Sequence, residues 1–128
     1  MTAPGASHAV YGQASRALGT PRSIEYQVFA QVNGRLSAAS GPEGTFPQLA
    51  DALWENQRLW TALITDLAQT ENALPEALRG QLISLGAFVM NHTRRVVARE
   101  AEVGPLVDIN AAVMRGLRTR ADAADPAA

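Results

Sequence analysis

Cysteine is absent from this chain of 128 residues. Its absence excludes thiol catalysis, disulfide frameworks and cysteine-based zinc sites. Lysine is also missing, so all 11 basic residues are arginine. The 12 acidic residues bring the formal charge to −1, and this balance gives no support for a nucleic-acid-binding face. The two histidines stand in no HExxH-type motif, so the sequence predicts neither a metal site nor a cofactor.

Long apolar runs are absent as well. No stretch approaches the length of about 18 apolar residues that marks a transmembrane helix. The N-terminal segment MTAPGASHAVYGQASRALGT lacks the apolar core of a secretory signal. The sequence therefore predicts a soluble cytoplasmic protein that does not enter a membrane. A chain of this length suits one domain with a core of its own.

Apolar residues recur at helical spacing, and no segment has the alternation of a β-strand. The spacing predicts four principal helices, over residues 21–39, 47–70, 74–97 and 105–118. A weaker pattern, interrupted by Gly12, predicts a short helix at 8–18. Short connections favour antiparallel neighbours, so we expect an all-α, single-domain antiparallel bundle. We expect the helical domain to span residues 9–118, between a mobile N-terminus at 1–8 and a disordered tail at 119–128.

The segment 74–97 carries two apolar stripes. The first contains Leu78, Leu82, Leu85, Val89 and Val96, and the second contains Ile83, Ala87, Met90 and Val97. A helix that is apolar on more than one side is typical of a central helix, so we expect the other helices to pack around it. Gly86 lies inside this helix, and we expect it to permit the close approach of a neighbouring helix or aromatic ring.

Four polar side chains stand on or beside the apolar stripes: Asn56, Asn91, Asn110 and His92. A buried amide without partners costs about 1–3 kcal/mol, so the asparagines need partners. Two interpretations stay open for them, a polar layer that stabilises the bundle and a binding groove. We interpret His92 as a core histidine with satisfied ring nitrogens, because no nucleophile or orienting carboxylate stands near it in the sequence.

No arrangement of catalytic residues appears, so we expect the chain not to be an enzyme. A small bundle with broad apolar stripes is suited to holding another helix in a groove. The candidate contacts for such a partner are the large side chains near the stripe edges, namely Trp54, Trp60, Phe88 and Met90. Each could instead pack inward, as stripe residues usually do. Tyr11 is a further candidate, because the N-terminal segment could lie over the groove and be displaced.

Three motifs stand close together between residues 52 and 93. The second predicted helix carries an asparagine and a tryptophan four residues apart, Asn56 and Trp60. An N-x-LP turn follows at 72–75, and the stretch LGAFVMNHT follows at 85–93. Together these motifs resemble the FlaF family of flagellar biosynthesis regulator proteins.

The resemblance continues towards both ends and covers about residues 9–118. The family's opening motif AYG…SPRELE is matched by Tyr11, Gly12, Pro21, Arg22 and Glu25. Its closing motif is matched by Ile109, Asn110, Gly116 and Leu117. The departures are small, such as threonine in place of serine before Pro21.

The resemblance implies a cytoplasmic, non-enzymatic role in flagellum assembly. Members of the family promote flagellin synthesis and filament assembly, and they oppose or cooperate with FlbT, which acts on flagellin messenger RNA. The resemblance makes flagellin the expected partner, bound as by a secretion chaperone. Flagellin's terminal segments are amphipathic helices, which can dock an apolar stripe into a groove.

The alternative is a post-transcriptional regulator that acts on flagellin messenger RNA together with FlbT. Direct RNA binding requires a basic surface with exposed aromatic side chains for stacking. The chain has one arginine cluster, at Arg94, Arg95 and Arg99, and the end of a helix attracts such residues without any ligand. Direct contact with nucleic acid is therefore not expected.

Overall fold

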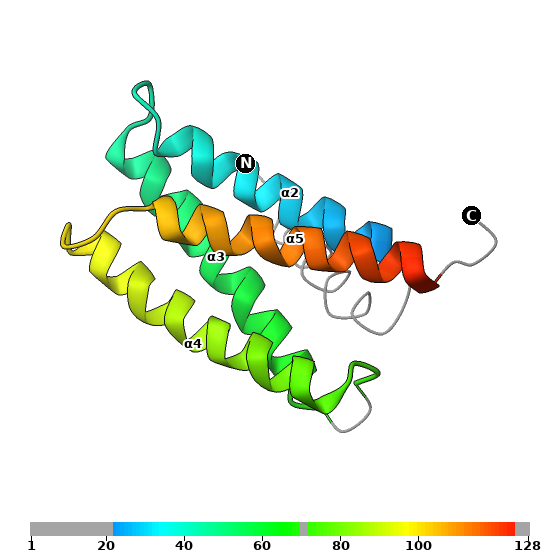
Figure 1. The fold of residues 1–128 in the computed structure, drawn as a ribbon. Coiled ribbons are helices and arrows are strands. Elements are labelled where there is room, and N and C mark those ends of the chain that lie inside the picture. Colours follow the sequence, from blue (N-terminus) through cyan, green and yellow to red (C-terminus); the bar gives the residue numbers. More distant parts are fainter. Residues whose placement is uncertain (1–21, 70–71, 125–128) are drawn as a thin grey trace.

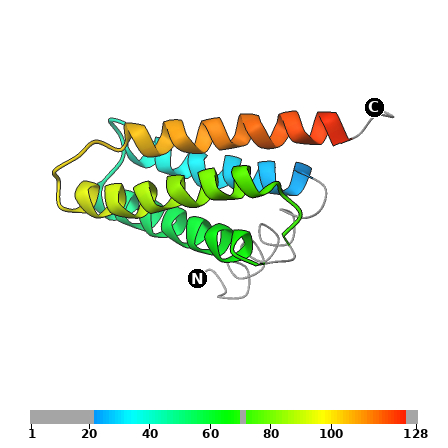
Figure 2. The same ribbon diagram turned by 60° about the horizontal axis from the view of Figure 1, so that its bottom comes forward.

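Four helices pack side by side, and each reverses the direction of the one before it (Figures 1 and 2). The computed structural model describes residues 22–69 and 72–124. Its helices are α2 (Arg22–Ala39), α3 (Phe46–Leu67), α4 (Glu76–Val97) and α5 (Gly104–Ala124). This architecture confirms the predicted all-α bundle of four principal helices. The short helix predicted at 8–18 lies outside the described residues.

The start of α3 is fixed by a reciprocal capping box. The backbone N–H of Gln48 donates to the Thr45 hydroxyl at 3.3 Å, and the Gln48 side-chain oxygen accepts from the Thr45 N–H at 3.0 Å. Pro47 stands in the first turn, where a missing N–H costs nothing. These contacts satisfy N–H groups that the first turn of a helix otherwise leaves unpaired.

The end of α5 differs from the prediction. The helix continues to Ala124, beyond Arg118, so residues 119–124 of the predicted disordered tail are helical. This segment, TRADAA, is half alanine and contains neither glycine nor proline. Its high helix propensity extends the helix even though no large apolar side chain is present to pack on the core.

The most deeply buried helix is α3. Its core side chains have exposed fractions of 0–1%: Leu53, Leu59, Trp60, Leu63 and Leu67. In α4 the second apolar stripe is only partly covered: Ile83 and Met90 are half-buried against the core, whereas Ala87 is exposed and Val97 has an exposed fraction of 49%. The prediction that 74–97 forms the central helix is therefore wrong. This helix packs on α3 but touches α5 over only a short stretch, which leaves one apolar flank without a covering helix.

The close contact between α3 and α4 is made at Gly86. A Cβ atom at this position would lie 2.7 Å from Cγ1 of Ile64 and 3.4 Å from Cε3 of Trp60. This geometry confirms that Gly86 permits the close approach of a neighbouring helix and aromatic ring. A Cβ atom at Gly80, earlier in the same helix, would meet nothing within 4 Å.

Substitution by alanine should therefore change the free energy of unfolding in opposite directions at the two glycines of α4. Gly80→Ala should raise the free energy of unfolding by about 0.5–1 kcal/mol, because alanine favours the helix. Gly86→Ala should lower it by about 1 kcal/mol or more, since Ile64 is stiff at χ1 and overpacking costs about 1–3 kcal/mol. Urea unfolding of both variants checks this. Stabilisation by Gly86→Ala would contradict the tight α3–α4 contact.

Candidate functional site

A buried polar cluster joins α2, α3 and α5. The indole N–H of Trp60 donates to Oδ1 of Asn110 at 2.8 Å. The Asn110 amide donates to Oδ1 of Asn56 at 2.7 Å and to Oδ1 of Asn33 at 3.2 Å. Asn33 in turn donates to the Val107 carbonyl at 3.3 Å. Since Asn56, Trp60 and Asn110 have exposed fractions of 0%, this cluster is an internal polar layer rather than the lining of a groove.

The polar cluster differs from the predicted layer in one member. Asn91 is exposed on α4, and its oxygen accepts a hydrogen bond from Arg94, so its assignment to the layer is wrong. Asn33 takes that place. Asn33 was not predicted as a member, although its position four residues after Phe29 puts it on the flank of the α2 stripe.

Trp60 is not available to a partner. Its ring is fully buried and meets the ring of Phe29 edge-on, with the centroids 6.0 Å apart. Of the two alternatives, the structure shows inward packing for Trp60. Its indole N–H explains the inward position, because the acceptor on Asn110 lies inside the bundle.

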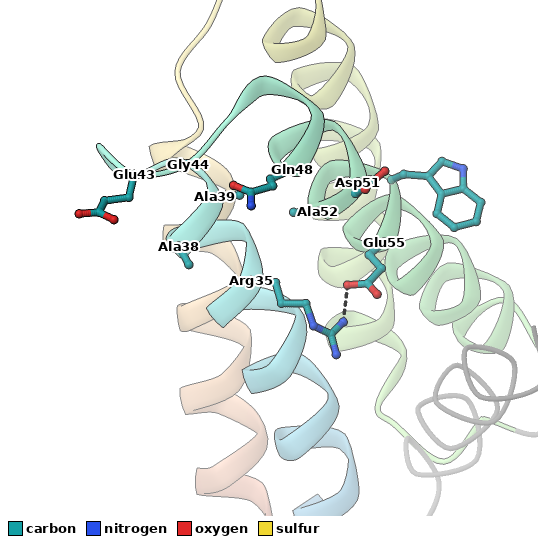
Figure 3. Close-up of a pocket in the computed structure, with 10 residues that line it drawn as sticks. Arg35, Ala38, Ala39, Glu43, Gly44, Gln48, Asp51, Ala52 and Glu55 are labelled. Carbon is teal, nitrogen blue, oxygen red and sulfur yellow. Dashed lines mark hydrogen bonds and ion pairs between the residues drawn. The ribbon is translucent and has the colours of Figure 1, made fainter. Parts of the chain in front are cut away.

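Trp54 lies on the surface, with an exposed fraction of 56%. It borders a hollow of about 650 Å³ between the end of α2 and the start of α3. The Arg58 guanidinium carbon lies 4.7 Å from the centroid of its ring. Arg35 and Glu55 form a salt bridge within the hollow (Figure 3). The exposed tryptophan therefore borders a hollow in which charged groups alternate with the small apolar side chains of Ala38, Ala39 and Ala52.

Phe88 is the second exposed candidate, with an exposed fraction of 44%. Its ring stacks on the His92 ring with the centroids 5.2 Å apart. Nε2 of His92 lies 2.7 Å from the Glu102 carbonyl oxygen, while Nδ1 has no partner among the described groups. Thus His92 is a core histidine, as predicted, but with one ring nitrogen satisfied. Met90 is half-buried against the core, and Tyr11 lies outside the described residues.

An apolar groove of about 320 Å³ opens between the first half of α4 and the middle of α5. It is lined by Leu74, Leu78, Gln81, Leu82, Leu85, Ala112, Val113, Gly116 and Leu117. Gln81 is the one polar side chain in this lining. The α5 side of the groove carries little side-chain volume, because Ala112 and Gly116 are small. A Cβ atom at 116 would meet nothing within 4 Å.

The groove has a natural extension along α4. Phe88 follows Gln81 by seven residues, about two helical turns, so both lie on the same side of the helix. Its exposed ring therefore continues the apolar wall beyond Leu85. Phe88 was predicted as a candidate contact, but the position of the groove was not predicted. The available signal was the pair of small residues four apart on α5, Ala112 and Gly116.

A family model described as flagellar protein FlaF matches residues 7–117. The chain belongs to the FlaF family. The matched region contains the polar cluster and every residue that lines the groove. Membership of this family gives the chain a flagellar role. A search of curated proteins and a search of solved structures find no match.

The family's N-x-LP motif closes one end of the groove. The Asn72 amide donates to the Asp66 carboxylate at 2.9 Å, and its oxygen accepts from the Leu74 N–H at 2.9 Å. Burial raises the pKa of the Asp66 carboxyl, and the hydrogen bond from Asn72 opposes this by lowering it. The turn thus holds Leu74, which is buried, at the groove's end.

The described part of the chain offers neither a membrane-spanning helix nor a cluster of metal ligands. No helix there is long and apolar enough to span a membrane. Within residues 22–69 and 72–124, histidine, aspartate and glutamate side chains nowhere gather in threes that could bind a metal ion. The groove and the exposed rings of Phe46, Trp54 and Phe88 are the apolar features that the described surface offers to a partner.

The polar cluster predicts that substitution by alanine lowers the free energy of unfolding much more at Asn110 than at Asn91. Asn110→Ala should lower the free energy of unfolding by about 2–4 kcal/mol, because it leaves the Trp60 N–H and the Asn56 oxygen buried and unpaired. The control Asn91→Ala changes an exposed side chain and should stay within about 0.5 kcal/mol. Urea unfolding measures both. Equal effects of the two substitutions would contradict a structural role for the cluster.

Proposed function

We propose that this FlaF-family chain acts in the cytoplasm as a non-enzymatic secretion chaperone that holds flagellin for assembly. The observation that carries the proposal is the apolar groove between α4 and α5. Exposed apolar surface of this kind is typical of interaction sites, because water contact with it is unfavourable. Family membership directs the choice of partner towards flagellar proteins.

The dimensions of the groove fit a helix. Leu78 and Leu85 stand seven residues apart, which corresponds to about 10 Å along α4. An amphipathic helix presents apolar side chains at positions i, i+3 or i+4, and i+7 over the same distance. The small side chains of Ala112 and Gly116 allow the backbone of the incoming helix to approach α5 closely.

Flagellin supplies such a helix before it assembles. Its terminal segments are amphipathic, and their apolar faces have no partner in a free subunit. Docking one face into the groove would remove it from water and reduce aggregation while the subunit waits for export. The chain would release the segment when the filament offers a larger apolar interface.

The alternative function is regulation of flagellin messenger RNA together with FlbT. Its supporting observation is the pairing of the exposed Trp54 ring with the Arg58 guanidinium, a combination that can stack on bases. Binding through phosphates would weaken steeply with added salt, whereas binding in an apolar groove would change little. Salt dependence therefore separates the two functions.

A charge placed in the groove should weaken flagellin binding. Ala112→Glu would put a carboxylate against an apolar helix, and the affinity should fall at least about tenfold, equivalent to about 1.4 kcal/mol. The control Ala87→Glu changes an exposed residue of α4 outside the groove lining and should bind as the original chain does. Calorimetry with monomeric flagellin, at low and high salt, measures both.

The original chain should bind flagellin with a negative heat-capacity change, and this binding should persist at high salt. Absence of binding by a bundle whose folding is verified by circular dichroism would reject the chaperone function. Equal affinity of the Ala112→Glu and Ala87→Glu variants for flagellin would instead indicate that flagellin binds outside the groove.

A further inference from the structure

We propose that Gln81 fixes the register of the helix that the α4–α5 groove holds, and that this helix carries one amide or hydroxyl side chain within its apolar stripe. That the helix belongs to flagellin rests on the proposed function. The pattern that the groove selects in a helix depends only on the lining.

Gln81 stands in the rim of the groove between two leucines. It follows Leu78 by three residues and precedes Leu85 by four, so the three side chains share one flank of α4. Leu78 and Leu85 are half-buried, whereas Gln81 is exposed. A helix that rests on both leucines must therefore pass over Gln81.

The extension of the groove along α4 leads a bound helix over the same point. Phe88 follows Gln81 by seven residues and presents an exposed ring on the same side of α4. The ring of His92 stacks on it with the centroids 5.2 Å apart, which limits its orientation. On α5, Ala112 and Gly116 leave room for the backbone of an incoming helix. A helix that reaches from the leucines to the Phe88 ring therefore covers Gln81.

The Gln81 amide has no hydrogen-bond partner in the free chain other than water. Within residues 22–69 and 72–124, no group hydrogen-bonds to this side chain. An apolar stripe docked over it would displace the water and leave a donor and an acceptor unpaired, which costs free energy. An amide or hydroxyl side chain on the bound helix replaces the lost hydrogen bonds. Since every other residue of the lining is apolar, this contact is available in one register only.

The two leucines then specify what stands on either side of the polar residue. Along the axis of α4, Leu78 lies about 4.5 Å from Gln81, and Leu85 lies about 6 Å from it in the other direction. A helix packed alongside presents side chains at these distances three or four residues before and after its polar residue. The groove therefore selects one amide or hydroxyl residue with large apolar residues at those positions. A purely apolar stripe is disfavoured, because it leaves the Gln81 amide unpaired.

A double-mutant cycle with two synthetic peptides tests the contact. Both peptides are amphipathic helices of about 18 residues, long enough to be helical. They are identical except at the centre of a leucine stripe, where one has glutamine and the other has leucine. The measured quantity is the affinity for the glutamine peptide divided by the affinity for the leucine peptide. This ratio should be at least about tenfold higher for the original chain than for Gln81→Leu, equivalent to about 1.4 kcal/mol of coupling.

The matched control is Gln69→Leu, which changes an exposed glutamine just after α3, outside the groove lining. It should keep the ratio of the original chain. An equal ratio for the original chain and Gln81→Leu would overturn the proposal. Failure of the glutamine peptide to bind the original chain would overturn it as well.

The same variants connect the contact to flagellin. Gln81→Leu should weaken the binding of monomeric flagellin about tenfold, because it leaves the polar group of the bound helix unpaired, whereas Gln69→Leu should not. Unchanged affinity of Gln81→Leu for flagellin would contradict a polar contact at this position. A coupled response to the peptides by a chain that does not bind flagellin would reject the proposed function and leave the selected pattern intact.

Discussion

The hydrogen bonds of Asn110 are the constraint on which the arrangement of the bundle depends. This one side chain accepts from Trp60 and donates to Asn56 and Asn33, so it fixes α2, α3 and α5 relative to one another. A shift of any of these helices would leave buried polar groups unpaired, at a cost of about 1–3 kcal/mol each. The register of three helices is therefore set by a polar contact inside an otherwise apolar core.

The helix α4 is held by close packing on α3 rather than by the polar cluster. This difference leaves the groove open. Among the described residues, α4 contributes no side chain to the polar cluster and packs on α3 at Gly86, where the absence of a Cβ atom lets the two helices approach. Close packing on α3 keeps α4 in place while its flank towards α5 stays open. The same geometry that stabilises the α3–α4 pair thus leaves Leu78 and Leu85 half-buried in a groove.

The helices and the role of Gly86 could be predicted because they depend on local spacing and on backbone contact. The polar cluster could be predicted only in part. Asn56 and Asn110 stood on apolar stripes, but Asn91 has the same local pattern and points to solvent. The only sequence signal for the groove was the small pair Ala112 and Gly116, because its position depends on the relative placement of α4 and α5. The spacing also places Trp60 and Trp54 on different faces of α3. It could not show that the indole N–H of Trp60 would donate to Asn110 inside the core.

The most direct test of the account is to map where flagellin binds. Backbone amide signals of the chain, recorded by NMR with and without a peptide of a flagellin terminal helix, locate the contact. The account predicts shifts concentrated in α4 from Leu78 to Phe88 and in α5 from Ala112 to Leu117, the residues that line or extend the groove. Shifts centred on Trp54 and the hollow between α2 and α3, with the groove unchanged, would contradict it.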